Sequence, residues 1–135
     1  QPEIDPETLD TVPRLHLSTS DELLLRVRWL AILHGRIRAS LAVTGGVHVP
    51  LDVIKAIMAG AHAVQVVAAL LQHGPAFLAD LRRGISEWLE EREYDSLRQA
   101  QGSMSLERCP DPQAFERGNY LRVLQTWRPV PRVTR

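Results

Sequence analysis

The sequence predicts an α/β fold in which part of the central sheet is missing. Two short, mostly apolar runs at residues 40–44 and 63–67 have the length of buried strands. They are separated by a helical connection of about a dozen residues, which joins parallel strands rather than a hairpin. Apolar runs of this kind are typical of parallel strands covered on both faces. Because two strands do not form a stable sheet alone, we expect further strands from elsewhere.

Three helices flank the two predicted strands. Thr19 and Glu22 have the spacing of a capping box, which predicts the start of the first helix, and Gly35 is its natural end. Pro50 opens the second helix, because proline is favoured in the first turn. The order is therefore helix, strand, helix, strand, helix. The three helices are expected at residues 20–34, 50–59 and about 76–92.

The two ends of the chain have weaker patterns. Residues 1–17 contain three prolines and are expected to form a loop. The last residues, 128–135, are basic and interrupted by proline, which indicates a frayed tail. Between the third helix and this tail the sequence predicts a short helix near 96–101, a turn at 109–112 and a helix over 113–127.

Composition and charge argue against several classes of protein. The 135 residues carry 16 basic and 16 acidic side chains, and only 5% of them are aromatic, so neither a nucleic acid nor a membrane surface is the expected partner. No apolar run is long enough to cross a bilayer, and the N-terminus does not resemble a signal peptide. The chain begins without Met, so we expect an internal start. The single cysteine, Cys109, permits no internal disulfide and fits a cytoplasmic protein.

A pair of glycines directly after the first predicted strand is the most informative local pattern. Thr44, Gly45 and Gly46 end that strand and precede the helix opened by Pro50. Glycines here let the backbone turn tightly and bring amides near an anion, and a helix N-terminus adds further donors. Two interpretations stay open, a phosphate nest and a simple tight turn. The pattern is neither a dinucleotide fingerprint nor a P-loop.

The second predicted strand also runs straight into a short helix. Val67 and Ala68 lie at this junction, and residues 68–73 can form the helix. In (β/α)₈ barrels the loops after the last two strands often share one phosphate, helped by a short extra helix. The two consecutive strand ends therefore favour the phosphate interpretation, although core packing alone also explains the valines of this strand.

Longer segments share their pattern with a known family. They are residues 41–48, 52–61, 64–70, 73–75, 88–94, 102–105 and 108–112, together with Phe115 and Tyr120. In these segments the chain resembles the dihydroorotate dehydrogenase-like proteins, FMN-dependent (β/α)₈ barrels. The resemblance implies that residues 1–92 are the C-terminal part of an FMN-binding barrel, about its last two βα units, incomplete as given. Residues 93–135 would form a helical extension and tail.

The same resemblance implies which residues hold the cofactor. Gly45 and Gly46, which follow Thr44, would donate backbone amides to the FMN phosphate. Val67 and Ala68 would occupy the second phosphate loop. Relatives carry a hydroxyl residue in that loop, whereas Ala68 offers only its amide.

The resemblance also implies an activity, the oxidation of a CH–CH bond as in the conversion of dihydroorotate to orotate in pyrimidine biosynthesis. The catalytic base, the flavin-contacting lysine and the substrate-binding asparagines of the family lie earlier in the barrel, so this chain is expected to contain no catalytic residue. A small-molecule substrate and a homodimer are expected of the full-length protein. The alternatives are a barrel part that binds another phosphorylated ligand and a non-catalytic interaction piece.

Four single side chains have competing interpretations. Cys109 lies in a proline-bracketed turn and is expected to be structural. His48 follows the glycine pair, and a capping or solvated role is favoured over a phosphate contact. Trp29 and Trp88 occupy helical positions expected to face the core. The five histidines do not have the spacing of metal ligands, so no metal site is expected.

Overall fold

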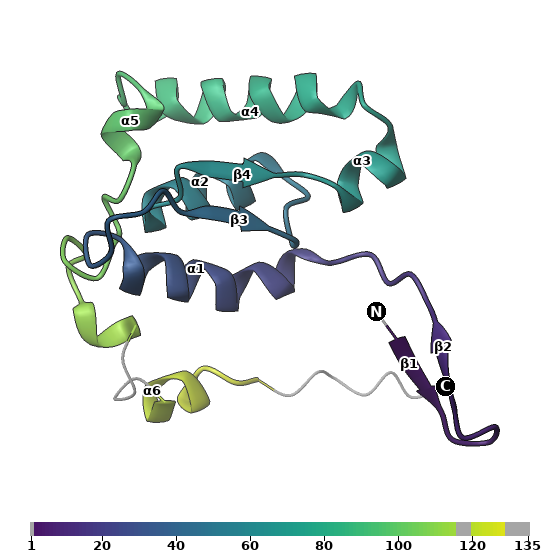
Figure 1. The fold of residues 1–135 in the computed structure, drawn as a ribbon. Coiled ribbons are helices and arrows are strands. Elements are labelled where there is room, and N and C mark those ends of the chain that lie inside the picture. Colours follow the sequence, from purple (N-terminus) through teal and green to yellow (C-terminus); the bar gives the residue numbers. More distant parts are fainter. Residues whose placement is uncertain (1, 116–119, 129–135) are drawn as a thin grey trace.

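The computed structural model describes residues 2–115 and 120–128, and it has a mixed helix and strand architecture. Two parallel strands lie at its centre, with α2 behind them, α1 along one side and α4 along the other (Figure 1). The elements are β1 Pro2–Asp5, β2 Asp10–Pro13, η1 Ser20–Glu22, α1 Leu23–Leu33, β3 Ala42–Thr44, α2 Pro50–Ala59, β4 Ala63–Gln65, α3 Ala68–His73, α4 Phe77–Glu91, α5 Leu97–Ala100, η2 Pro112–Phe115 and α6 Tyr120–Gln125.

The predicted order of helices and strands around the sheet is confirmed. β3 and β4 pair in parallel, with Ala42 opposite Ala63 and Thr44 opposite Gln65. The carboxylate of Glu22 accepts a hydrogen bond from the Thr19 amide at 3.2 Å, as expected of the capping box. The short helix α3 follows β4, also as expected.

One face of this sheet is not covered by any described element, contrary to the expectation of strands buried on both faces. Val43 is buried, but Ala42 and Thr44 on either side of it are exposed, and Ala63 and Gln65 of β4 are exposed as well. Side chains alternate between the faces of a strand, so the helices bury one set and leave the other open. Two short strands are too few to close a second layer over themselves.

The expected loop over residues 1–17 is wrong for its first part, which forms the antiparallel hairpin β1–β2. The loop was expected because proline cannot donate a hydrogen bond within a sheet. In the hairpin, however, Pro2 and Pro13 pair at the strand ends, where the missing amide hydrogen removes little of the hydrogen-bond ladder. The backbone amides of Glu7 and Thr8 donate to the Asp5 carboxylate, which closes the turn and lowers the pKa of Asp5 from its ordinary value.

The segment after α4 packs back onto the helices instead of leaving them. The amides of Gly102 and Met104 donate to carbonyls at the end of α2, and the Leu106 amide donates to the Ala31 carbonyl at 2.9 Å. The predicted short helix is α5, whereas of the predicted turn at 109–112 only residues 109 and 110 bend, and Pro112 already begins η2. The predicted helix over 113–127 appears as η2 and α6, with 116–119 outside the described residues, as is the tail from residue 129.

The core lies between α1, α2 and the covered face of β3, and it is built mainly from small and medium side chains. Trp29, expected in this core, is instead 53% exposed on α1. Trp88 is half-buried and stacks on Tyr94, with ring centroids 5.5 Å apart. The buried core residues are Leu23, Leu30, Ala31, Val43, Val47, Val53, Ala56, Ala59 and Ala61.

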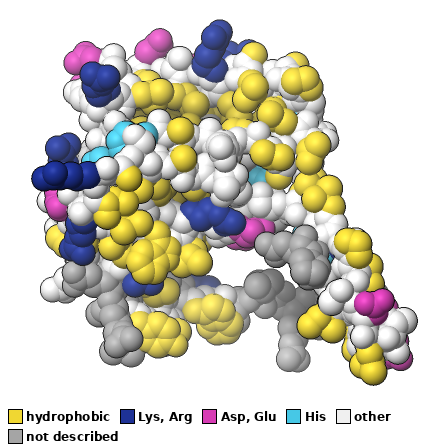
Figure 2. Space-filling view, in the orientation of Figure 1, with side chains coloured by type: hydrophobic (Ala, Val, Ile, Leu, Met, Phe, Trp, Pro, Cys, Tyr) yellow, Lys and Arg dark blue, Asp and Glu magenta, His cyan; other side chains and the backbone are white. Residues whose placement is uncertain are grey.

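Exposed hydrophobic side chains gather over α1 and over the C-terminal segment around α6 (Figure 2). Leu25 and Trp29 on α1 and Tyr120 and Trp127 on the C-terminal segment are each more than half exposed. Across the described ranges, no helix combines the length and the apolar character that crossing a bilayer requires.

We expect the isolated 135-residue chain to be molten or prone to aggregation, because the sheet has two open edges and one open face. The measurements are near-UV circular dichroism, which should be weak, and binding of a hydrophobic dye, which should be strong. The variant Trp29→Gln should bind less dye than the wild type. A cooperative thermal transition of a monomer would contradict this expectation.

Candidate functional site

A hollow of about 200 Å³ opens where the carboxyl ends of β3 and β4 meet. Thr44 and Gly45 reach it from the β3 side, and Val67 and Ala68 reach it from the β4 side. Four of the five residues predicted to bind a cofactor thus line a single hollow, although they belong to two separate loops. Its other lining residues are Leu15, His16, Leu17, Ser18, Val47, Gln65 and Leu71.

Gly46, the fifth predicted residue, lies behind this hollow rather than in its lining. Its amide donates to the Ser18 hydroxyl at 2.9 Å, so this donor already has a partner. A Cβ at Gly46 would lie 2.6 Å from the backbone nitrogen of Leu23, and the backbone has a φ of 80°. Glycine at this position therefore serves the close approach of α1 to the loop between β3 and α2.

The N-terminus of α2 is satisfied from within the chain. Asp52 is only 3% exposed, and its Oδ2 accepts hydrogen bonds from the amides of His48 at 3.0 Å and Val49 at 3.2 Å. The same oxygen accepts from the Ser20 hydroxyl at 2.7 Å. The buried carboxylate occupies the donors that an external anion would otherwise use at this helix end.

The start of α3 is different, because no side chain caps it. Val67 is its N-cap residue and makes no side-chain capping bond, and Ala68, the first helical residue, has no polar side chain. The first amides of a helix have no partner within the helix, so they need another acceptor or water. Together with Gly45, Val67 and Ala68 place backbone without polar side chains along the lining of the hollow.

Two parts of this site were not predicted from the sequence. Residues 15–17 line the hollow beside Ser18. The Arg26 guanidinium of α1 lies beside Gly45, with its Nη2 3.0 Å from the position that a Cβ of Gly45 would take. The sequence places Arg26 one turn after Glu22 but gives no sign of its contact with the β3 loop, because that contact depends on how α1 packs.

A larger hollow of about 700 Å³ runs beside the first, between α1 and the open edge of β3. Its lining is mainly apolar, with Leu25, Trp29 and Leu33 from α1 and Leu41 to Thr44 from the strand segment. Thr44 lines both hollows, so the two meet at the carboxyl end of β3.

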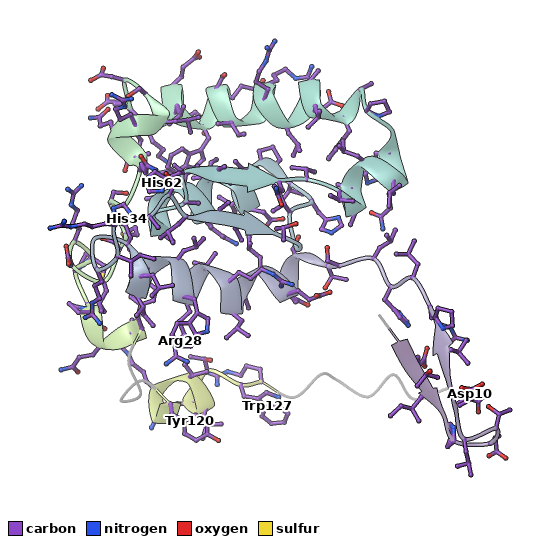
Figure 3. All side chains as sticks on the ribbon, viewed as in Figure 1. Asp10, Arg28, His34, His62, Tyr120 and Trp127 are labelled. Carbon is purple, nitrogen blue, oxygen red and sulfur yellow. The ribbon has the colours of Figure 1, made fainter. Side chains whose placement is uncertain are left out.

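His34 and His62 serve packing and turns rather than this site, whereas His16 lines the smaller hollow. His34 and His62 lie close together at the amino end of the sheet, with ring centroids 6.2 Å apart (Figure 3). The ring of His34 packs directly against Gly60 and Gly102, so a Cβ at either glycine would clash with it. The Leu41 amide donates to Nδ1 of His62 at 3.0 Å.

The remaining candidate side chains also lie away from the hollows. His48 lines neither of them, and its Nε2 is buried without a partner among the described residues. Cys109 is buried in its turn, where Sγ lies 3.8 Å from the Leu106 carbonyl oxygen. No group of three or more potential metal ligands occurs in the described part of the chain.

Comparison of the chain with protein families and with curated proteins found no match. A hollow of about 200 Å³ is smaller than the roughly 300–1,000 Å³ of pockets that hold a whole ligand. Backbone donors and an adjacent guanidinium suit the anionic end of a larger molecule, such as its phosphate.

The buried carboxylate of Asp52 provides a test of how this site is held. In protein made from the complete coding sequence, we expect Asp52→Ala to lower the free energy of unfolding by about 3 kcal/mol or more, because three buried donors lose their acceptor. Denaturant unfolding measures this change. The control Asp80→Ala removes an exposed carboxylate that pairs with Arg83 and should cost under about 0.5 kcal/mol. Equal losses in the two variants would show that Asp52 has no special role.

Proposed function

We propose that this chain is the phosphate-binding, C-terminal part of a cytoplasmic FMN-dependent oxidoreductase, a (β/α)₈ barrel of the dihydroorotate dehydrogenase type. The observation that carries the proposal is the hollow at the carboxyl ends of two neighbouring parallel strands, lined by Thr44, Gly45, Val67 and Ala68. Sites of barrel enzymes lie at this end of the strands, and the loops after the last two strands commonly bind a phosphate there.

The surroundings of β3 support a barrel that continues beyond this chain. The outer edge of β3 is unpaired within the described sheet, and the 700 Å³ hollow follows it. Leu25 and Trp29 of α1 expose apolar side chains toward this hollow. A further strand parallel to β3 would pair with the edge and bury these side chains, as the preceding strand of a barrel does.

FMN, when bound, supplies the flavin ring that accepts a hydride from the substrate. The residues of this chain would hold only the phosphate of that cofactor. Gly45 would bring backbone close to the phosphate because no side chain intervenes, and the amides at the uncapped start of α3, at Val67 and Ala68, would donate to the same phosphate. Because the hollow is too small for the flavin ring as well, parts of the protein outside this chain would bind that ring.

The catalytic steps would also belong to parts of the protein outside this chain. Within the described residues, Cys109 is buried far along the chain from the strand ends, and the Ser18 hydroxyl, which lines the hollow, accepts a hydrogen bond from the Gly46 amide. The proton acceptor and the substrate contacts for dihydroorotate, or a related compound with a CH–CH bond, would come from earlier strands.

Gly45→Val should weaken FMN binding by roughly ten- to a hundredfold, because losing one charge-assisted amide bond costs about 1.5–3 kcal/mol. A side chain at Gly45 crowds the phosphate and disfavours the φ of 81°. Ala68→Ser should bind FMN equally well or more tightly, because it adds a hydroxyl at the start of α3. The measurement is a flavin fluorescence titration of protein made from the complete coding sequence.

Riboflavin, which lacks the phosphate, is the matched ligand for this titration, and its affinity should barely change. Gly46→Val is the matched variant, and it should destabilise the fold and weaken both flavins, because its side chain collides with Leu23. If Gly45→Val weakens FMN and riboflavin equally, the loop does not bind phosphate. A full-length protein with no flavin absorbance that binds other phosphorylated compounds would instead support a barrel of different chemistry.

A further inference from the structure

The smaller hollow has donors for a phosphate but little positive charge of its own. None of its lining residues is Lys or Arg, and His16 is the one lining side chain that can carry a positive charge. His16 is exposed, and its Nε2 lies 3.5 Å from the Glu3 carboxylate, so its charge is directed toward the hairpin. A phosphate held only by neutral amides lacks the charge-assisted partner that makes such contacts strong.

Arg26 brings a permanent positive charge to the edge of this hollow. Its Nη2, Cζ and Nε lie 3.0, 3.2 and 3.4 Å from the position of a Cβ on Gly45, so the guanidinium plane runs alongside the glycine. Gly45 lines the smaller hollow, and Arg26 and Thr44 line the larger hollow that meets it. The cation thus lies directly beside the loop that offers its backbone to the ligand.

The present contacts of Arg26 leave part of its binding capacity unused. Nη1 donates to the Glu22 carbonyl oxygen, and Nη2 lies 3.8 Å from the Glu22 carboxylate, which is too long for a hydrogen bond. A guanidinium has five N–H donors in a rigid fork that matches a phosphate. The Arg26 side chain is 39% exposed, so these donors are accessible from the hollow.

The acidic neighbours of Arg26 hold it in position more than they neutralise it. Glu22 Oε1 accepts from the Thr19 amide at 3.2 Å, so this carboxylate is committed to capping the start of α1. Asp21 lines the same larger hollow as Arg26. A phosphate can carry more negative charge than one carboxylate and has more acceptor oxygens for the guanidinium, so it would compete with Glu22 for Arg26.

We infer that Arg26 is the cationic binding residue of this site, and that it contacts the non-bridging phosphate oxygens of the ligand beside Gly45. The inference rests on the proposed function, because it assigns a partner to the same phosphate. It also explains a feature of Gly45. Any side chain at that position would press on the guanidinium and separate it from the backbone donors.

The test compares Arg26→Gln with Arg28→Gln in protein made from the complete coding sequence. Arg28 lies on the same helix and is exposed, but its Nε donates to the Phe115 carbonyl oxygen at 2.9 Å, on the side of α1 toward α6 (Figure 3). Each protein is titrated with FMN, riboflavin and inorganic phosphate at low and at high salt. Arg26→Lys keeps the charge but loses the forked geometry.

Arg26→Gln should weaken FMN by about tenfold or more and leave riboflavin unchanged, and the dependence of FMN binding on salt should decrease. Arg26→Lys should fall between this variant and the wild type. Arg28→Gln should behave as the wild type with all three ligands. Inorganic phosphate should displace FMN less readily from Arg26→Gln than from the wild type, when compared at equal FMN occupancy.

Failure of the inference is distinguishable from failure of the proposed function. If the wild type binds FMN no more tightly than riboflavin, the phosphate site itself is absent and both proposals are overturned. If the wild type prefers FMN and Arg26→Gln keeps the same preference, only the role of Arg26 is overturned. If Arg26→Gln weakens both flavins equally and lowers the thermal midpoint, Arg26 supports the fold through Glu22 instead.

Discussion

The buried carboxylate of Asp52 is the contact on which the arrangement of the site depends. One oxygen of this side chain joins the hydroxyl of Ser20, before α1, to the amides of His48 and Val49, before α2. The Gly46 amide bonds to Ser18 in the same place, so the start of α1 is tied to the loop after β3 by side chain and backbone together. This junction fixes where Gly45 and Arg26 lie relative to each other.

The parts of the structure that sequence reasoning predicted well are those governed by local rules. Helix ends followed from capping residues and glycines, as at Thr19 and Gly60, and the parallel pairing followed from the helical connection between two apolar runs. The hollow at the strand ends also agrees with the two predicted loops. The fold class is therefore predictable here as α/β, while the barrel remains our proposal.

The predictions that failed depended on contacts between distant residues. Trp29 lies at a position that is apolar by helical spacing, but no element among the described residues covers it. Prolines alone predicted a loop, although the hairpin positions them where a strand tolerates them. In the sequence, Arg26 has the pattern of an ordinary surface charge, and only the packing of α1 against the β3 loop brings it beside Gly45.

The short connection between β3 and β4 has a consequence for how the site is assembled. The two strands are joined only by the β3–α2 loop, α2 and a tight turn at Gly60, so their pairing closes a small loop at low entropic cost. Contacts of this local kind form early in folding. Both walls of the smaller hollow, with Thr44 and Gly45 on one side and Val67 and Ala68 on the other, can then assemble as one cooperative unit.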